Sequence, residues 1–353
     1  MNQHKKSCEG EAARRRAIER GLEFVYATSC DPANFEDYGF DYLSCLSSIY
    51  STSKDQYLRR IALKMCQERV RFWCDTHPTI PSELDADTVT EFVFARDAAD
   101  RIGLPDEGMK NQIRRAAKHF SAQDYFWFDP TVEGPPNDIP DSCECGSENS
   151  RGFTACRQCQ RLLTPMSRYE VWLVALIRSY LGEHYGVVLG ARYADVLRWL
   201  PSMRPYWSLE NESPSDLTWA IYAATHVVYT LNDYGTYNVS PKWLPHEFEF
   251  LRQQMDSAIK VDDPETVGEI IDALKAFGLT GDSLIAQGEE FVLSRQNPDG
   301  SWGEVEVDDI YERYHPTIAA IDGLRSNAWR GLRLSLESVK PILQQSGGDC
   351  SSN

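Results

Sequence analysis

The sequence predicts an all-α protein, an α/α toroid in which about six helical hairpins form two concentric layers. Three observations support this prediction. Apolar residues recur with a helical period along most of the chain, and the alternation typical of strands is scarce. Gly and Pro separate the helical segments into pairs. In most pairs the first segment is apolar all round, whereas the second is amphipathic and charged.

The predicted pairs cover the chain from residue 38 to residue 345. They are 38–51 with 55–75, 88–104 with 108–126, 167–183 with 190–200, 216–234 with 245–259, 264–278 with 283–296, and 315–326 with 333–345. A helix that is apolar all round must be buried and an amphipathic helix can cover it, so the alternation predicts an inner and an outer layer. An open α-solenoid with a binding groove is the alternative arrangement. We expect one domain over 1–353, with 1–20 and 346–353 flexible.

Charge and hydropathy limit the classes of partner. The chain has 353 residues, of which 42% are hydrophobic, and its 36 basic and 53 acidic side chains give a net charge of −17. This charge repels nucleic acids and anionic membrane surfaces at long range, so we expect neither as a partner. No secretory signal and no run of about 20 apolar residues is present, and we expect a cytoplasmic protein. The oligomeric state is left open.

Four of the ten cysteines form the pattern Cys143-x-Cys145-x10-Cys156-x2-Cys159. They lie in a stretch of low helix propensity between the second and third pairs, which we interpret as an insertion over 130–165. Two thiolate pairs on tight turns can close a tetrahedral shell about 2.3 Å from zinc. We therefore predict a zinc-ribbon-like structural site with no position open for catalysis. A redox pair and unligated thiols are the alternatives.

Four predicted helices each carry a Glu or a His just ahead of a similar apolar run. These residues are Glu170, His226, Glu269 and His315, and they are separated by 56, 43 and 46 residues. Each separation is close to one hairpin, so successive hairpins can present the four side chains at one level of a shared cavity. Carboxylates and imidazoles together suit zinc, iron or manganese. We predict a second divalent metal there. The alternative is that the two carboxylates lie near helix N-termini, where the helix dipole stabilises them, and that the two histidines are hydrogen-bonded core residues.

Three further residues are candidates for catalysis near this cavity. Asp233 and Asp322 each follow a predicted ligand, His226 and His315 respectively, by seven residues, which is about two helical turns. Tyr229 lies three residues after His226 and shares its face. We interpret these residues as acid–base groups or partners of the ligands. The alternative is that the two aspartates stabilise loops at helix ends.

A resemblance follows from the segment SRQNPDGSWGE at 294–304, which contains Gln296, Asp299, Gly300 and Trp302. It resembles the Q-x-x-D-G-S-W repeat of terpenoid cyclases and their relatives in the α/α toroid superfamily. The resemblance implies that the Gln and the Trp tie a helix end to the loop that follows.

The next segment, YERYHPTIAAIDGL, resembles a region of protein prenyltransferase β subunits. The resemblance covers about residues 260–330, and it implies that His315 is a zinc ligand with Glu269 as the acidic ligand. No Cys lies near Glu269, and the D-x-D-D motif of protonation-initiated cyclases is absent. The acidic approach AIKVDDPETVG also disfavours diphosphate binding, which needs clustered cations.

These patterns predict a metal-dependent enzyme, with iron or zinc, that acts on a small, partly apolar molecule in the cavity of the toroid. A terpenoid cyclase or prenyltransferase-like enzyme is the first alternative. The second is a non-enzymatic α-repeat interaction module with a structural zinc.

Overall fold

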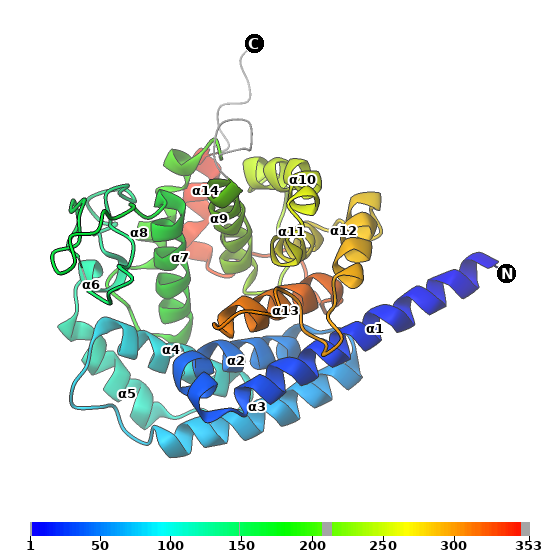
Figure 1. Ribbon diagram of the computed structural model, residues 1–353, viewed down its shortest axis with the longest axis horizontal. Helices are drawn as coiled ribbons and strands as arrows, with labels where there is room; N and C mark the ends of the chain where they lie inside the picture. Colours follow the sequence, from blue (N-terminus) through cyan, green and yellow to red (C-terminus); the bar gives the residue numbers. More distant parts are fainter. Residues whose placement is uncertain (1, 148, 207–213, 347–353) are drawn as a thin grey trace, which may run out of the picture.

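The computed structural model describes residues 2–147, 149–206 and 214–346 (Figure 1). In these ranges the chain forms fourteen α-helices, three short 3₁₀ helices and isolated β-bridges, without a strand. The all-α prediction is confirmed. The α-helices are α1 (Asn2–Ser29), α2 (Pro32–Thr52), α3 (Gln56–Thr76), α4 (Ala86–Arg101), α5 (Glu107–Ala116), α6 (Ala122–Phe126), α7 (Arg168–Tyr185), α8 (Tyr193–Leu197), α9 (Pro214–Asn232), α10 (Pro245–Lys260), α11 (Pro264–Ala276), α12 (Ser283–Ser294), α13 (Tyr311–Leu324) and α14 (Lys340–Ser346). None of the described helices is long and apolar enough to cross a membrane.

The predicted pairs appear in their expected order. Apart from α2, which begins at Pro32 rather than at residue 38, the main differences lie in the second helices. The helices predicted at 108–126, 190–200 and 333–345 are divided or shortened. The first is divided because Asp124 accepts a hydrogen bond of 2.6 Å from the backbone N–H of Ser121, which begins the new helix α6.

Aspartate side chains fix where many of the helices begin. Each accepts hydrogen bonds from backbone N–H groups in the first turn, which would otherwise lack intrahelical partners. The caps of α2, α3, α4, α5, α11 and α12 are Asp31, Asp55, Asp85, Asp106, Asp263 and Asp282. The first residues of these helices are therefore specified by the local sequence.

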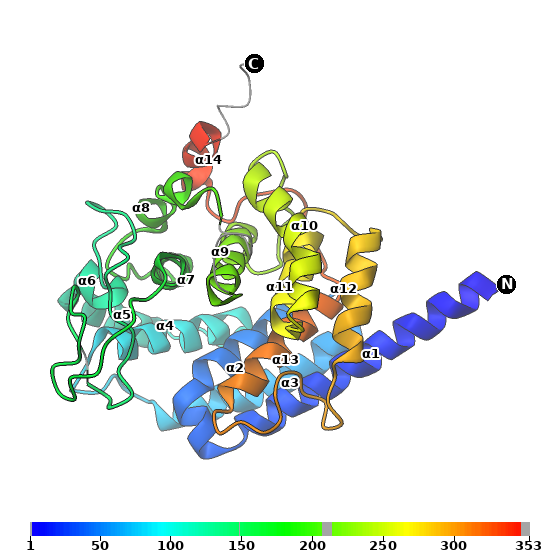
Figure 2. The same cartoon turned by 45° about the horizontal axis from the view of Figure 1, so that its top comes forward.

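The first helices of the pairs pack against one another in chain order. α2 contacts α4, α4 contacts α7, α7 contacts α9, α9 contacts α11, and α11 contacts α13. α13 returns to α2, since the Tyr314 hydroxyl donates a 2.8 Å hydrogen bond to Asp41 and its ring lies 4.7 Å from that of Tyr42. These six helices are labelled in Figure 2, and each of α3, α5, α8, α10 and α12 packs against one or two of them.

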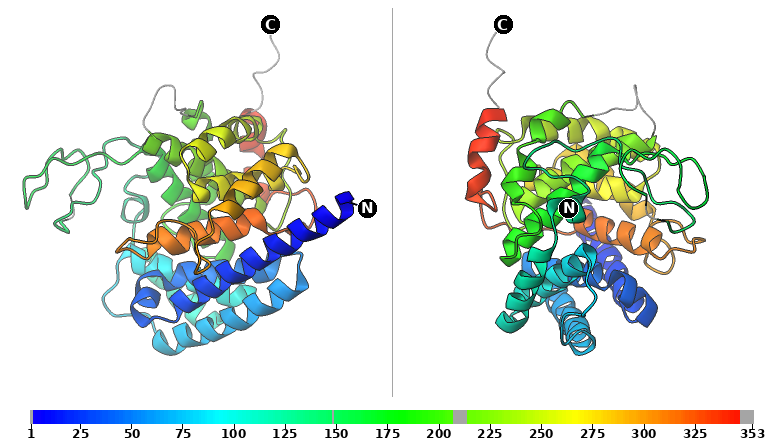
Figure 3. Two further views of the ribbon diagram at one scale, coloured as in Figure 1. Left: turned by 45° about the vertical axis from the view of Figure 1, so that its right-hand side comes forward. Right: turned by 90° about the vertical axis from the view of Figure 1, so that its left-hand side faces the viewer.

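Helix α1 occupies the segment for which a flexible terminus was predicted. Its apolar residues Ala17, Ile18, Leu22 and Val25 are buried, and it packs against α13 and α2. The guanidinium of Arg20 also donates to backbone carbonyls of the loop after α12. Its first turns extend beyond the body (Figure 3). Residues 347–353, at the other predicted flexible end, lie outside the described residues.

The loop after α12 is tied to the end of that helix by Gln296 and Trp302. The Gln296 amide donates to the carbonyl of Gly300 at 3.0 Å and to that of Ala17 in α1 at 2.8 Å. The indole of Trp302 is fully buried and donates to the carbonyl of Val292 at 2.7 Å. Gln296 and Trp302 thus hold the loop against the end of α12, and Gln296 also joins it to α1.

Two glycines let α11 and α13 approach closely. A Cβ atom on Gly268 would lie 2.6 Å from the carbonyl oxygen of Ala319, and one on Gly323 would lie 2.7 Å from the carbonyl oxygen of Gly268. Both contacts are with backbone, which cannot rotate away. The contact matters because α11 is buried at every position from Thr266 to Ala276.

The substitution Gly268→Ala is expected to destabilise the protein by about 1–3 kcal/mol, because the added methyl group forces the two helices apart. Urea unfolding followed by circular dichroism measures the change. The control is Gly10→Ala in α1, whose Cβ would meet no atom within 4 Å and which should be neutral or slightly stabilising. Equal stability of Gly268→Ala and the wild type would contradict the close packing.

Candidate functional site

The six first helices share one cavity of about 220 Å³. Its apolar lining includes Phe94 of α4, Ile177 and Leu181 of α7, and Ile318 of α13. The polar lining comes from all six helices except α7, together with the turn after α9. The titratable side chains in it are Asp41, Asp97, Arg101, His226, Tyr229, Tyr234, Glu269, His315 and Asp322, with Cys45 beside them.

The structure brings three of the four predicted ligands to this cavity. His226, Glu269 and His315 line it, and Glu170 does not. Glu170 lies too near the start of α7. The first residue of α7 that lines the cavity is Ile177, which is seven positions after Glu170 and about 10 Å further along the helix axis. Burial, followed by the charge of Asp141, raises the pKa of Glu170 to about 7.

Glu265, in the first turn of α11, joins two of the walls of the site. Its carboxylate accepts a hydrogen bond from Nδ1 of His315 at 2.8 Å and another from the hydroxyl of Tyr222. Burial opposes the ionisation of Glu265, but the charge of His315 and these two hydrogen bonds hold its pKa below the ordinary value. Burial lowers the pKa of His315, but the negative charge of Glu265 and its hydrogen bond outweigh this effect and raise the pKa of the imidazole to about 9.

His226 is held in the opposite charge state. Its Nδ1 lies 2.9 Å from the carbonyl oxygen of Tyr222, which can only accept, so Nδ1 carries the proton and Nε2 has the lone pair. Burial is the main cause that lowers the pKa of His226 to about 4. At neutral pH this imidazole is therefore a neutral base, while His315 is a cation.

Glu269, beside His226, is held as a neutral acid. Its Oε2 accepts a 2.5 Å hydrogen bond from the hydroxyl of Thr225 and lies 3.7 Å from Nδ1 of His226. Burial raises the pKa of Glu269 to about 8, which keeps the carboxyl protonated at pH 7. One wall of the cavity thus holds a neutral acid, a neutral base and a charged imidazole.

The three predicted catalytic residues lie in different surroundings. Tyr229 lines the cavity beside His226, with ring centroids 5.2 Å apart, and donates to the carbonyl of Glu269 at 3.0 Å. Asp322 also lines the cavity, and it accepts a 2.5 Å hydrogen bond from Arg325. Asp233 follows the end of α9 with a φ of 55° and is not among the lining residues.

Asp233 belongs to an ionic cluster centred on Arg101. The guanidinium donates to Asp97 at 2.7 Å and to Asp233 at 3.1 Å. His184 contacts Asp97 at 2.7 Å through Nδ1, and the hydroxyl of Tyr180 donates to Asp233 at 2.9 Å. Asp233 therefore binds the C-terminal end of α9 to α4 and α7, and its negative charge is paired.

The cavity set does not form a metal shell as it is placed. Among the described residues, the four cysteines are the one group of three or more His, Cys, Asp or Glu whose donor atoms all lie within 4.8 Å of one another. The hydrogen bonds of His226 and His315 use Nδ1, which leaves Nε2 of each ring for a ligand in the cavity. The metal predicted there stays a prediction.

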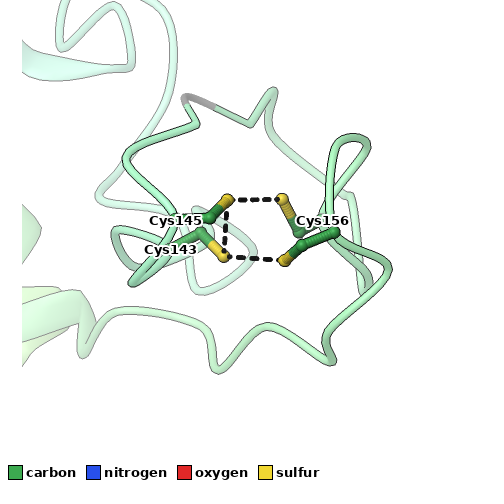
Figure 4. A group of neighbouring side chains, drawn as sticks. Cys143, Cys145 and Cys156 are labelled. Atoms are coloured by element: carbon green, nitrogen blue, oxygen red, sulfur yellow. Dashed lines mark hydrogen bonds between the residues drawn. The ribbon is translucent and has the colours of Figure 1, made fainter.

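The four cysteines of the insertion converge as a metal shell requires. The sulfur of Cys143 lies 3.5 Å from that of Cys159 and 3.4 Å from that of Cys145, which is 3.6 Å from that of Cys156 (Figure 4). A tetrahedron of thiolates about 2.3 Å from zinc has edges of roughly 3.8 Å. The residues therefore fit a closed metal site.

The backbone of the insertion supports this arrangement. Gly146, with a φ of 74°, donates to the carbonyl of Cys143 at 2.7 Å, and Gln160, with a φ of 61°, donates to that of Cys156 at 2.9 Å. Backbone N–H groups, first that of Cys159, lower the pKa of Cys156 to about 5, so this thiol is ionised at neutral pH. Two tight turns thus present two thiol pairs toward one point.

Sequence reasoning missed Glu265, Asp41 and Arg101. Glu265 precedes Glu269 by four residues, the spacing that places two side chains on one helix face. That spacing is the signal that could have identified it. Asp41 and Arg101 carry no comparable pattern, and only the packing of α2 and α4 brings them to the cavity.

Comparisons of the chain with protein-family models, with curated proteins and with solved structures give no match. The site must therefore be interpreted from its own geometry.

The free energy of unfolding is expected to fall as the pH rises from 6.5 to 9. Folding raises the pKa of His315 from 6.5 to about 9, so its contribution is complete below pH 6.5 and is lost as the pH passes 9. Glu269, whose pKa rises from 4.5 to about 8, acts in the same direction. Urea unfolding at several pH values measures the slope.

The variant Glu265→Gln should lose part of this slope, because it removes the carboxylate that raises the pKa of His315. The exposed residue Glu249 offers a matched control, and Glu249→Gln should keep the slope of the wild type. Identical slopes in all three proteins would show that the Glu265–His315 pair does not control the pH dependence.

Proposed function

We propose that the chain is an enzyme that binds a small, partly apolar molecule in the cavity and transfers protons to and from it. The observation that carries the proposal is that His226, Glu269 and His315 meet at one wall of the cavity, in surroundings that drive their pKa values apart. Groups tuned in this way are typical of acid–base catalysis.

Each group has a distinct role in the proposed reaction. Nε2 of His226 accepts a proton from the substrate, because Nδ1 is committed to the carbonyl of Tyr222. The neutral carboxyl of Glu269 returns a proton at another atom of the substrate. His315 stabilises negative charge that develops on the substrate, and Glu265 positions it. The reaction class is an isomerisation, elimination or cyclisation without net change of charge.

The proposed architecture is an α/α toroid. The support is the cyclic order of contacts among α2, α4, α7, α9, α11 and α13, and their shared cavity. The contacts of Gln296 and Trp302 support the distant kinship with terpenoid cyclases that the sequence suggests. A cyclisation begun by proton transfer from Glu269 falls within the proposed reaction class.

We assign the insertion a structural zinc held by Cys143, Cys145, Cys156 and Cys159. The convergence of the four sulfurs supports zinc, which would fix the two turns to each other. With four protein ligands the ion has no open position, so the insertion takes no part in proton transfer.

The reaction is tested by incubating purified protein with a small-molecule cell extract and following depletion and appearance of compounds by mass spectrometry. Glu269→Gln and His226→Gln are expected to slow turnover by about 10²–10⁴-fold, since each removes one proton-transfer group. The exposed His246 and Glu249 provide controls, and His246→Gln and Glu249→Gln should keep full turnover. Unchanged turnover in the cavity variants, or no turnover by the wild type, would contradict the proposal and favour an interaction module.

Metal analysis of the purified protein tests the zinc assignment. We expect one zinc per chain, lost in the Cys143→Ser/Cys156→Ser double variant and retained in Cys30→Ser, which changes an exposed cysteine outside the insertion. Retention of zinc in the double variant would contradict the assignment. Two metals in the wild type and one in His226→Ala/His315→Ala would replace the proton-transfer proposal by a metal-dependent one.

A further inference from the structure

The charges around the cavity favour a positively charged ligand. We propose that the cavity binds a molecule with a protonated amine on an apolar body. Its ammonium group pairs with the carboxylate of Asp41, donates to the neutral carboxyl of Glu269 and is faced by the rings of Tyr229 and Tyr234. This inference names the substrate class of the site and therefore rests on the proposed function.

Acidic groups outnumber permanent cations among the lining residues. Four carboxyls line the cavity, namely Asp41, Asp97, Glu269 and Asp322, and Arg101 is the one Lys or Arg in this lining. Arg101 already pairs with two carboxylates, Asp97 and Asp233, whose combined negative charge exceeds its own positive charge. An anionic ligand would find no unengaged guanidinium or ammonium group among the described lining residues.

Asp41 and Glu269 differ from the other two carboxyls in their partners. Asp97 is paired with Arg101 and Asp322 with Arg325, whereas Asp41 receives its hydrogen bond from the hydroxyl of Tyr314 and Glu269 from that of Thr225. A hydroxyl satisfies the hydrogen-bonding capacity of a carboxyl but does not neutralise a buried negative charge. Glu269 avoids that charge by keeping its proton, whereas an ionised Asp41 needs a cation beside it.

His315 does not neutralise Asp41. Its Nδ1 makes an ion pair of 2.8 Å with Glu265. Burial raises the pKa of Asp41 and of Glu269, and the charge of His315 offsets this effect only in part. A ligand ammonium beside Asp41 would complete the local charge balance and favour the ionised carboxylate, and three N–H donors match the carboxyl oxygens and the nearby serine hydroxyls of α2.

Aromatic rings and apolar side chains suit the rest of such a ligand. Tyr229 and Tyr234 line the cavity with ring centroids 6.0 Å apart, and ring faces attract an ammonium group. Phe94, Leu181 and Ile318 offer an apolar surface for a hydrocarbon body. The combination favours an amine with an aromatic or aliphatic skeleton over a sugar or a polyanion.

Three probes of one shape and different charge test the inference: phenethylammonium, 2-phenylethanol and phenylacetate. Binding is measured by isothermal titration calorimetry at pH 7 in the presence of EDTA, so that a divalent cation cannot mediate it. We expect the ammonium to bind at least tenfold more tightly than the alcohol and phenylacetate to bind most weakly. Equal or tighter binding of the alcohol or of phenylacetate would overturn the inference, and so would the absence of binding by all three at 10 mM.

Substitutions then locate the binding site. Asp41→Asn retains the size of the side chain and should reduce the preference for the ammonium at least fivefold, whereas Glu36→Gln, an exposed carboxyl on the same helix, should retain it. If Asp41→Asn fails to fold, the wild-type series still decides the charge preference. Tighter binding of phenylacetate together with turnover lost in Glu269→Gln would reject the amine and retain the proton-transfer proposal. Ammonium binding without turnover would reject the reaction and retain the ligand class.

Discussion

The carboxylate of Glu265 connects three helices at the wall of the cavity. It belongs to α11, accepts the hydroxyl of Tyr222 from α9, and pairs with the imidazole of His315 from α13. Because Asp263 caps α11 just before it, the carboxylate also lies where the helix dipole favours a negative charge. Glu265 orients His315 and favours its positive charge, and through Tyr222 and His315 it links α9 to α13.

Burial and charge then divide the roles among the neighbours of Glu265. Burial is the main cause that keeps His226 neutral and Glu269 protonated, and neither has a strong ion-pair partner. His315 is also largely enclosed, but its partner reverses the effect of burial. One cavity therefore contains a base, an acid and a cation, and the main difference between the two imidazoles is that His315 has an ionised partner.

Local patterns in the sequence predicted the helices, but not how far each helix is shifted along its axis relative to its neighbours. Apolar periodicity and aspartate caps such as Asp55 and Asp282 fix where helices begin, and the pairs α2/α3, α9/α10 and α11/α12 lie close to their predicted ranges. Spacing along the chain predicted the order of the site residues as well. It could not predict that α7 reaches the cavity at Ile177, so Glu170 lies too far along that helix.

Two other differences arise from contacts between distant parts of the chain. Helix α1 is rich in charge and begins within the segment 1–20 that was expected to be flexible, and the structure buries Ala17 and Ile18 at the end of that segment, where α1 packs against α13 and α2. The role of Glu265 likewise appears only when His315, 50 residues later, is brought beside it. The cysteine site was more accessible to prediction, because its four ligands lie within one short insertion.

The most direct test of this account is ¹⁵N NMR of the imidazole rings at pH 7, with assignments from His226→Gln and His315→Gln. We expect His315 to show two protonated ring nitrogens, and His226 to be neutral with its proton on Nδ1. Two neutral imidazoles, or a charged His226, would contradict the division of acid, base and cation that underlies the proposed chemistry.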